Sequence, residues 1–370
     1  MILFLNFAPI EYLGGAERKM YDLYKELSKN ENVIIYTLTT KLASIYGNLV
    51  LSESFKDRSD GGLLYKLNTR RFISLKSLIP LTSSWWEVRH DFINARIIYT
   101  KFEINELLII LFYLGPSGLR KTIASVRSPL VYNYPINIFD FFHNKLYTSI
   151  FIPYLLTRLQ KIHVLTKRDK DYIISLYKNI EVTEIPIYAD IQKGRSSSKK
   201  NKYFTIIYVG ALNIRKGLDL ILSSVNLLPE NYRIEVIGDG PLAKNVIKKS
   251  KDYPNKLKYH GYMQHEKAIN LIKKADVLIL PSRAEGFGGV LLEALSLGIP
   301  IITSPAIKID VPGNIELKMD NFTPEELVKK IVEHKGNIQH KIITKEVILN
   351  YFLRNYTKQK IMKEMLNLFK

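Results

Sequence analysis

Residues 275–304 read ADVLILPSRAEGFGGVLLEALSLGIPIITS, and this stretch decides the fold. Residues 277–280 are an apolar run with the length of a buried strand, and residues 299–302 resume that pattern. Between them, apolar side chains recur at helical spacing from Val290 to Leu297, directly after a turn rich in glycine. Strand, turn and helix predict an α/β unit whose turn offers unpaired backbone N–H groups to an anion.

Two carboxylates frame this turn. Glu285 stands just before the glycines, and Glu293 follows eight residues later, about two helical turns further on. A carboxylate accepts hydrogen bonds, so a pair around an anion site suits hydroxyl groups that flank a phosphate, such as those of a ribose and a sugar. The alternative is that Glu285 only complements the helix dipole and that Glu293 is only solvated. The turn alone leaves both interpretations open.

A second anion site is predicted upstream. Residues 204–209 predict a strand, Gly210 follows it, and Arg215 and Lys216 precede a helix that extends to Val225. Adjacent cations at a helix start suit a diphosphate, because the guanidinium is a bidentate fork and the ammonium a mobile point charge. Lys216 is the first candidate for the phosphate and Arg215 the second. The alternative is a pair of solvated cations.

The predicted elements divide the 370-residue chain into two α/β domains. Residues 191–201 are polar, rich in Ser and Lys and without periodicity, so we interpret them as a linker. It separates an N-terminal Rossmann-like domain, residues 1–190, from a second one, residues 202–352. Strands and helices alternate on both sides of the linker, which is typical of doubly wound parallel sheets. Residues 353–370 carry an apolar stripe and predict a terminal helix.

The glycine-rich turn resembles the E-x7-E signature of the family-four retaining glycosyltransferases, here Glu285-Gly286-Phe287-Gly288 with Glu293 and the later Gly298-Ile299-Pro300. The resemblance implies the GT-B fold. In that fold two Rossmann-like domains face an interdomain cleft, the first binds the acceptor and the second a nucleotide sugar, and the last helix crosses back onto the first. It also implies catalytic roles for Glu285, Lys216 and Arg215, and a contact between Glu293 and the ribose.

The same resemblance implies further contacts with a nucleoside diphosphate sugar. In the N-terminal domain, residues 14–18 read GGAER and resemble the family's opening, in which the backbone approaches the donor phosphate. Such a diglycine also occurs as a plain connection between a strand and a helix. The implied donor-side residues are Gly14, Gly15, Gly210, Gly261, Tyr262, Met263, Phe287, Gly288, Gly289, Val290 and Glu293.

The N-terminal domain departs from the family pattern. In many relatives a histidine near the end of a strand faces the reacting centre, and we expect residues 130–134 to be that strand. This stretch contains Asn133 and no histidine. An amide can hydrogen-bond a sugar hydroxyl, so Asn133 is the acceptor-side candidate, with a turn-forming Asn as the alternative. Relatives also often carry an arginine after the first glycine of the second domain, where this chain has Ala211.

Charge and composition limit the function classes. The net charge is +19, and it is spread evenly, with 28 Lys and Arg against 18 Asp and Glu in residues 1–200 and 26 against 17 in the rest. An even excess argues against a dedicated nucleic-acid site and leaves contact with anionic lipid headgroups open. The chain has no cysteine, no apolar run of ~18 residues and no secretory leader, so we expect a cytoplasmic protein, with the membrane face as an open peripheral site.

Two apolar stretches allow two interpretations. Residues 84–87 read SWWE, and residues 107–114 are rich in Leu and Ile. Core helices are the expected outcome, because apolar stripes at helical spacing are mostly buried. The alternative is an exposed surface for an acceptor or a membrane.

The predicted function is a retaining, metal-independent transfer of a sugar from a nucleoside diphosphate sugar to a hydroxyl of a glycan, lipid-linked or protein-linked acceptor. We expect no metal site and no cofactor apart from the donor. One alternative is a nucleotide-sugar epimerase or a phosphorylase on the same fold. The other is a non-enzymatic basic protein that binds nucleic acid or a membrane, which would explain the charge but not the spacing of Glu285 and Glu293.

Overall fold

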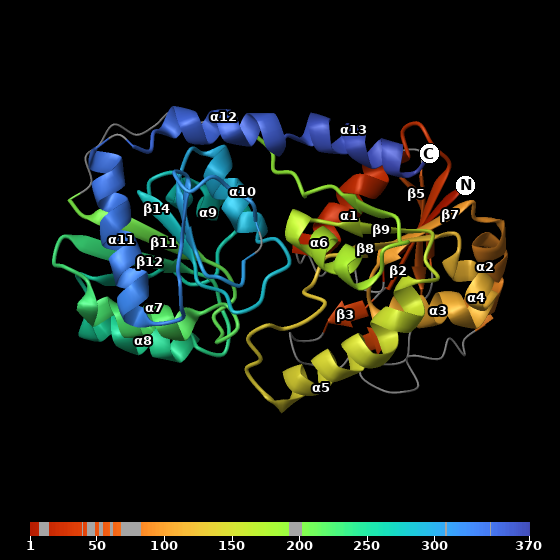
Figure 1. Cartoon of the computed structure of the whole chain (residues 1–370), viewed down its shortest axis with the longest axis horizontal. Helices are drawn as coiled ribbons and strands as arrows, with labels where there is room; N and C mark the ends of the chain where they lie inside the picture. Colours follow the sequence, from red (N-terminus) through yellow and green to blue (C-terminus); the bar gives the residue numbers. More distant parts are fainter. Residues whose placement is uncertain are drawn as a thin grey trace. The chain divides into compact units, whose positions relative to one another are not determined.

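The computed structural model describes residues 1–6, 15–38, 40–42, 49–51, 55–59, 62–67, 83–191, 202–307, 309–340 and 342–370. The chain divides into two compact units (Figure 1). Unit 1 comprises Met1–Leu130, Lys145–Ile185 and Met362–Lys370, and unit 2 comprises Val131–Asn144 and Pro186–Ile361. Among the described residues, no helix combines the length and the apolar composition needed to cross a bilayer.

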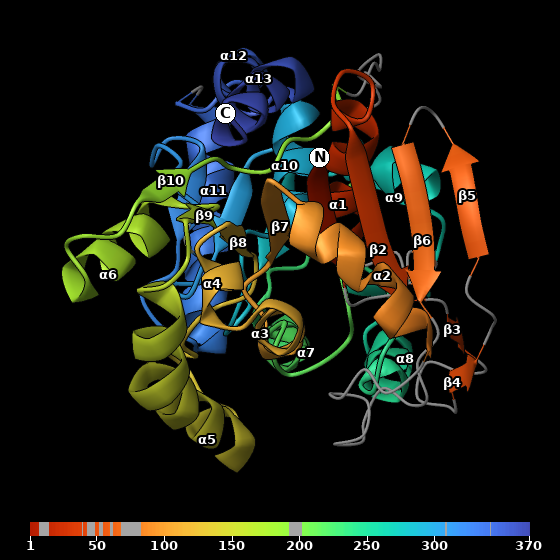
Figure 2. The same ribbon diagram turned by 90° about the vertical axis from the view of Figure 1, so that its right-hand side faces the viewer.

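Unit 1 is built on an eight-stranded sheet in the order β10-β9-β8-β7-β1-β2-β6-β5, in which only the β5–β6 pair is antiparallel (Figure 2). Its strands are β1 (Ile2–Asn6), β2 (Val33–Leu38), β5 (Phe55–Ser59), β6 (Gly62–Leu67), β7 (Ile97–Lys101), β8 (Thr122–Val126), β9 (Lys161–Val164) and β10 (Val182–Glu184). Its first helices are α1 (Gly15–Leu27), α2 (Ser83–Asn94), α3 (Ile104–Leu114) and α4 (Pro116–Leu119). Helix α5 (Ile138–Leu146) leads into the π-helix η2 (Tyr147–Leu156), and α6 (Lys167–Leu176) follows. Strands β3 (Thr40–Leu42) and β4 (Leu49–Leu51) pair separately.

The first strand and helix of unit 1 follow the apolar pattern of the sequence. Ile2, Leu3, Phe4 and Leu5 are all buried, as expected for a central parallel strand that is covered on both faces. Helix α1 buries an apolar stripe at helical spacing, which consists of Met20, Leu23, Tyr24 and Leu27. The apolar period of the sequence therefore positions this βα unit correctly.

Unit 2 has a six-stranded sheet in the order β13-β12-β11-β14-β15-β16, and all its pairs are parallel. The strands are β11 (Phe204–Val209), β12 (Tyr232–Ile237), β13 (Leu257–Tyr259), β14 (Val277–Leu280), β15 (Ile301–Thr303) and β16 (Glu316–Lys318). The helices are α7 (Leu218–Ser224) with the 3-10 turn η3 (Val225–Leu227), α8 (Ala243–Asp252), α9 (His265–Ile272), α10 (Gly289–Ser296), α11 (Pro324–Gln339) and α12 (Lys345–Asn355). In Figure 1, α7 and α8 lie below this sheet and α9 and α10 above it. The parallel α/β architecture expected for the second half is confirmed.

The end of the chain packs on the first sheet. Helix α13 (Lys358–Leu368) is followed by Phe369, which is buried. The ring of Phe369 lies 5.9 Å from that of Phe4 and 5.2 Å from that of Tyr99, measured between ring centroids. Aromatic rings at these separations and tilts attract one another and exclude water. The expected packing of the terminal helix on the N-terminal sheet is confirmed.

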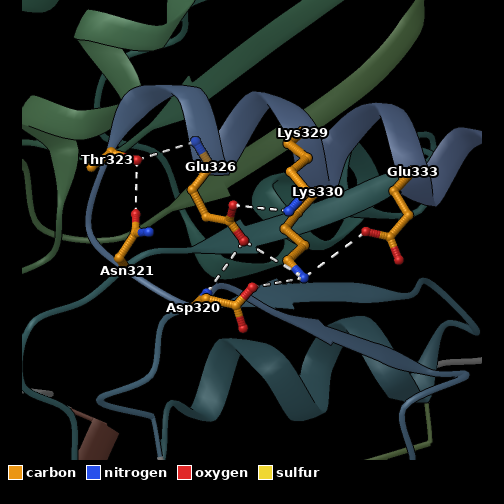
Figure 3. Close-up of polar contacts among 7 residues, drawn as sticks. All are labelled: Asp320, Asn321, Thr323, Glu326, Lys329, Lys330 and Glu333. Atoms are coloured by element: carbon orange, nitrogen blue, oxygen red, sulfur yellow. Dashed lines mark hydrogen bonds and ion pairs between the residues drawn. The ribbon is translucent and has the colours of Figure 1, made fainter.

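Helix α11 begins at a side-chain cap (Figure 3). The hydroxyl of Thr323 accepts a hydrogen bond from the backbone N–H of Glu326 at 3.3 Å, which satisfies one of the free donors of the first turn. The carboxylate of Glu326 accepts from the backbone N–H of Asp320, and Lys330 lies within 4 Å of acidic groups on Asp320, Glu326 and Glu333. Thr323 is therefore the N-cap of α11.

One sequence expectation in the first half was wrong. Residues 130–134 form no strand, because Tyr132 and Tyr134 place their rings against Arg215 and Phe322 of unit 2. The strand position belongs to β8, whose five residues are all buried between β7 and β9.

Residues 107–114 belong to α3, which is mostly a core helix as expected. Leu107, Ile110 and Tyr113 are buried, and Leu108 and Phe112 are exposed on the other side of the helix. Residues 84–87 belong to α2, but the placement of their side chains lies outside the described residues.

Candidate functional site

The candidate site lies at the point in unit 2 where the strand order reverses. From β11 the chain proceeds to β12 on one side, and from β14 it proceeds to β15 on the other. Strands β11 and β14 are parallel neighbours, so the loops that leave their carboxyl ends emerge side by side. In open α/β sheets this switch point is the usual place for a ligand. The two loops are the ones that carry Lys216 and Glu285.

Arg283 ties the two loops together. Its backbone N–H donates to the carbonyl of Arg215 at 2.8 Å, and its guanidinium donates to the carbonyl of Ile214 at 2.6 Å. Two further hydrogen bonds of 2.7 Å each join this guanidinium to both carboxylate oxygens of Asp219 at the start of α7. A bidentate pair of this kind fixes orientation as well as distance. The relative placement of the two loops is therefore built into the unit.

Lys216 and Glu285 meet across these loops. The Lys216 ammonium donates to Oε2 of Glu285 in a short ion pair, and the Ser282 hydroxyl donates to the same oxygen at 3.3 Å. Both charged side chains are partly buried, the carboxylate more than the ammonium. A pair with little water around it holds its geometry better than a surface pair. Of the three predicted catalytic residues, the structure brings these two together.

Glycine is required where the loops touch. Gly217 has φ of 74°, and a Cβ atom at this position would lie 2.1 Å from the carbonyl oxygen of Pro281. That conformation is costly for a residue with a side chain, and the space is closed as well. Gly217 therefore permits the close approach that lets Lys216 reach Glu285.

Arg215 points elsewhere. Its guanidinium pairs with the buried carboxylate of Asp140 at 2.8 Å and lies over the ring of Tyr132, 4.5 Å from the ring centroid. Burial raises the pKa of Asp140, but hydrogen bonds from Arg215 and from the N–H of Ile136 outweigh it and hold that pKa below its usual value. The second cation of the predicted pair thus anchors the segment Val131–Asn144 to unit 2.

Asn133, the acceptor-side candidate, lies in this anchored segment. It is exposed and stands between Tyr132 and Tyr134, whose rings pack on Arg215 and Phe322. The ring contacts place the backbone of Asn133 beside the Arg215 loop.

Helix α10 begins at the glycine-rich turn. Its cap, Gly288, has φ of 82°, and its first residue, Gly289, is exposed. Phe287 has a buried side chain that packs edge-on against Tyr356, so only its backbone is available to a ligand. Val290 follows in the first turn of the helix and is half-buried. The turn therefore presents backbone N–H groups rather than side chains, as an anion site requires.

Glu293 lies in the middle of α10, and its side chain has a partner that the sequence did not indicate. Its Oε1 lies 2.9 Å from Nε2 of His265, the first residue of α9. Both side chains are partly exposed, so they remain accessible to a ligand. The contact joins the start of α9 to the middle of α10.

The expected base-side residues follow β13. Gly238 donates its N–H to the carbonyl of Gly261, which connects the ends of β12 and β13. Gly261 has φ of 70° with open space where a Cβ would be, and Tyr262 is 80% exposed. Met263 is half-buried. An exposed aromatic ring beside an open glycine has the features of a stacking surface for a planar base.

Three predicted glycines remain, namely Gly14, Gly15 and Gly210. Gly210 directly follows β11, and its N–H donates to the carbonyl of Ile237. Gly15 is the first residue of α1 in unit 1. Gly14 lies outside the described residues. In the described part of the chain, no group of three or more His, Asp or Glu side chains is arranged to hold a metal ion.

Three residues of the site were missed by sequence reasoning, namely Tyr132, Asp140 and His265. Asp140 stands in an aromatic stretch 75 residues before Arg215, and no local pattern joins the two. His265 had one usable signal in the sequence, since it stands at the start of an amphipathic stretch with Ala268, Ile269 and Ile272 at helical spacing. Polar residues at helix starts near a strand end are candidates for ligand contacts in a doubly wound sheet.

A known family model matches the part of unit 2 that carries both loops of the site. Residues 190–323 match the family model of glycosyl transferases group 1. The chain is 27% identical to uncharacterized glycosyltransferase MJ1178 of Methanocaldococcus jannaschii over 201 residues, which are 52% of this chain and 55% of that protein. It is 23% identical to MJ1069 of the same organism over 390 residues, which cover 97% of this chain and 95% of that protein.

The solved structures share the fold over the whole length. The structure of Anabaena HepE in complex with UDP and glucose matches with a TM-score of 0.72 and 14% identity, covering 99% of this chain and 98% of HepE. Two parallel α/β units, a site at the switch point of the second and a terminal helix on the first are the GT-B arrangement. The chain therefore has the GT-B fold of these structures, and its residues 190–323 match the model of the group 1 glycosyl transferases.

Proposed function

We propose that this protein transfers a glycosyl group from a nucleoside diphosphate sugar to an acceptor hydroxyl, with retention of configuration and without a metal ion. The observation that carries the proposal is the meeting of Lys216 and Glu285 at the switch point of the unit 2 sheet. The complex of HepE with UDP and glucose supports a nucleotide sugar as donor.

The chemistry needs charge stabilisation. When the glycosidic bond to the donor breaks, the sugar becomes oxocarbenium-like and the diphosphate gains negative charge. Positive groups held in place before the reaction lower this barrier most, because they need no reorganisation. The Lys216 ammonium, which Glu285 and the joined loops hold in position, and the N–H groups of Gly288 and Gly289 are the donors that would face the diphosphate.

The two carboxylates have separate roles in this proposal. Glu285 accepts hydrogen bonds from hydroxyl groups of the donor sugar while it orients Lys216. Glu293 accepts from the ribose hydroxyls, with His265 as its partner before the nucleotide binds. Gly261, Tyr262 and Met263 contact the base. These roles place the donor along one edge of the sheet, from α9 to the Lys216 loop.

Arg215 contributes differently from Lys216. Its guanidinium belongs to the same loop as Lys216, but the ion pair with Asp140 commits part of its charge. We propose that it supports the catalytic loop and holds Asn133 on the side from which an acceptor approaches. The departing diphosphate itself takes the proton of the acceptor hydroxyl, so no side chain acts as covalent nucleophile.

In this proposal residues 1–190 are the acceptor-binding domain, residues 191–201 a linker and residues 202–352 the donor domain. Gly14 and Gly15 would approach the donor phosphate from unit 1. The acceptor is a glycan, lipid-linked or protein-linked hydroxyl compound. Closure around both substrates would exclude water and prevent hydrolysis of the donor.

Peripheral contact with an anionic membrane is proposed for one surface, the apolar stripe of α5 and η2. It consists of Ile138, Phe142, Leu146, Ile150 and Tyr154, all exposed and four residues apart. A spacing of four residues is slightly more than one turn of an α-helix and slightly less than one turn of the wider π-helix. The stripe therefore rotates around the helix axis in one sense along α5 and in the opposite sense along η2. The five side chains therefore follow one side of the continuous helix.

The charges around the stripe favour a lipid surface. Phe139 beside it is 78% exposed, and Phe141 is exposed as well. Residues 131–160 contain a single acidic residue, Asp140, which is buried against Arg215, whereas Lys145 and Arg158 are exposed. An exposed aromatic helix flanked by cations is typical of interfacial membrane binding.

Vesicle sedimentation tests the membrane contact. The wild-type chain should sediment with vesicles that contain phosphatidylglycerol, and the double variant Phe139→Ser/Phe142→Ser should remain in the supernatant. Phe112→Ser, which removes an exposed ring from α3, is the matched control and should sediment normally. Equal sedimentation of all three proteins would remove this proposal.

The catalytic proposal is tested with a thermal-shift panel of nucleoside diphosphate sugars, since a ligand of the native state raises its stability. The stabilising donor is then incubated with acceptor candidates, and the anomeric configuration of the product is read by NMR. Retention, and activity that persists in EDTA, are expected. Conversion of the donor without any acceptor would indicate an epimerase instead. Binding of nucleic acid with steep salt dependence and no turnover would indicate the non-enzymatic alternative.

A further inference from the structure

Unit 1 holds a guanidinium that has no acidic partner among the residues that the structure describes. Arg127 follows β8 directly and is half-buried. Its Nε donates to the hydroxyl of Ser125 at 3.2 Å, and its Nη2 donates to the hydroxyl of Tyr99 at 3.3 Å. Among the described residues no carboxylate lies within ion-pair distance of it, and its Nη1 donates to no protein group. The charge is oriented but not neutralised.

The groups behind Arg127 are neutral and buried. The hydroxyls of Tyr99 and Ser125 lie 2.7 Å and 3.0 Å from Nδ1 of His163, whose Nε2 lies 2.8 Å from the carbonyl of Ile185. Because a carbonyl only accepts, Nε2 carries the proton and Nδ1 accepts from a hydroxyl. Burial and then the charge of Arg127 lower the pKa of His163 to about 3, so this ring stays neutral at physiological pH.

Two hydrogen bonds orient the guanidinium of Arg127. The Nε and Nη2 groups of Arg127 donate to the hydroxyls of Ser125 and Tyr99. Neither hydroxyl carries a negative charge that would neutralise the guanidinium. A cation removed partly from water without a counter-ion is costly, and an arriving anion relieves that cost. If Arg127 served only to donate hydrogen bonds to Tyr99 and Ser125, its charge would add nothing, because a neutral amide could donate to the same hydroxyls.

The position of Arg127 is one where ligands bind. It lies at the carboxyl edge of the unit 1 sheet, next to β7, and the strand order of this sheet reverses between β7 and β1. Ligands of doubly wound sheets bind beyond this edge. The free Nη1 of a fixed guanidinium suits a phosphate or a carboxylate, which it can bind with a charge-assisted hydrogen bond.

We propose that Arg127 binds an anionic group, a phosphate or a carboxylate, on the acceptor. The proposal rests on the proposed function only in treating the ligand of unit 1 as the acceptor. It adds a chemical class to that acceptor, which is a hydroxyl compound that carries a negative charge close to the reacting group. Tyr99, Ser125 and His163 are positioning residues in this site.

The test uses the full chain with Lys216→Ala as background, so that phosphate bound at the unit 2 loops does not contribute. Melting temperatures are measured with increasing inorganic phosphate, against sodium chloride at equal ionic strength. Phosphate should raise Tm of the background chain by a few degrees. Adding Arg127→Gln should abolish the rise, whereas Arg120→Gln, which removes an exposed arginine after α4, should retain it.

An equal rise with Arg127→Gln, or no rise in the background chain, would overturn the proposal. The fold of the Arg127→Gln chain is checked by its Tm in sodium chloride, and Arg127→Lys, which keeps the charge, should regain part of the phosphate response. A failure of the donor site is distinguished separately, because Lys216→Ala would then leave the thermal shift with nucleoside diphosphate sugars unchanged.

A second arm identifies the source of the anion. Glucose 6-phosphate in solution and phosphatidic acid in vesicles both present a phosphate monoester. The carrier whose binding falls at least tenfold in Arg127→Gln, about the loss of one charge-assisted hydrogen bond, is the class to which the acceptor belongs. If binding of neither carrier falls, the site does not recognise an anionic acceptor.

Discussion

The Lys216 ammonium is paired with the Glu285 carboxylate, 69 residues further along the chain, where two adjacent parallel strands end. Neither residue is held by its own loop alone. Gly217 allows the loops to touch, and Arg283 clamps one to the other. A charge that is fixed in this way before a ligand arrives is the kind of group that stabilises a leaving diphosphate.

Removing the Lys216 ammonium should therefore reduce turnover. We expect Lys216→Ala to lower kcat by on the order of 100-fold or more, as the loss of one preorganised donor typically does. Initial rates at saturating donor and acceptor measure it, with Lys244→Ala, an exposed lysine of α8, as the control of equal charge change. Wild-type turnover in a folded Lys216→Ala protein would remove Lys216 from the mechanism.

Glu293 should act on binding of the nucleotide. Glu293→Gln keeps the size of the side chain but loses its charge, so we expect affinity for the free nucleoside diphosphate to fall roughly tenfold or more. Calorimetric titration measures this affinity, and Glu266→Gln, an exposed acid at the start of α9, is the control. The ribose role is refuted by an affinity that stays the same.

Gly217 should be intolerant of any side chain. The Cβ of Gly217→Ala would collide with the carbonyl of Pro281 and would also require a left-handed backbone, so the free energy of unfolding should fall by at least about 2 kcal/mol. Gly313→Ala is the matched control, because a Cβ there meets nothing within 4 Å, and it should change stability by less than about 0.5 kcal/mol. Urea denaturation compares the two variants. Similar effects at both positions would contradict the tight loop contact.

His334 should make the fold sensitive to acid. It is fully buried in α11 with neither ring nitrogen hydrogen-bonded, and burial lowers its pKa to about 4 from about 6.5. Between these values the unfolded chain binds more protons, so stability falls as the pH drops from 6.5 towards 4, by at most about 3 kcal/mol from this residue.

His334→Phe should remove that contribution and flatten the decrease in unfolding free energy between pH 6.5 and 4. Denaturation curves at a series of pH values measure it. The exposed His90 of α2 serves as the comparison, and His90→Phe should keep the wild-type slope. An unchanged slope in His334→Phe would show that this ring is not the group that titrates.

Much of the second half was predictable because the two strands that flank the site, β11 and β14, are mainly apolar runs. Residues 277–280 and 204–209 became β14 and β11 at the predicted places, and the loops that follow them held the predicted Lys216 and Glu285. Parallel neighbours bring such loops together without further information. This is why residues from two distant motifs could be assigned to one site from the sequence.

The first half was less predictable for a physical reason. Residues 130–134, LVYNY, contain as many β-branched and aromatic side chains as β8, TIASV, yet only the latter is a strand. The rings of Tyr132 and Tyr134 are instead used in contacts with Arg215 and Phe322. Tertiary contacts of this kind outweigh local propensity, and they also give Arg215 partners that no local pattern predicts.

The most direct measurement is a crystal structure of the full chain with its nucleoside diphosphate bound. The account predicts the diphosphate within hydrogen-bonding distance of the Lys216 ammonium and of the N–H groups of Gly288 and Gly289, with the ribose hydroxyls on Glu293. A nucleotide bound in any other place, or a diphosphate that leaves the Lys216–Glu285 pair untouched, would contradict it.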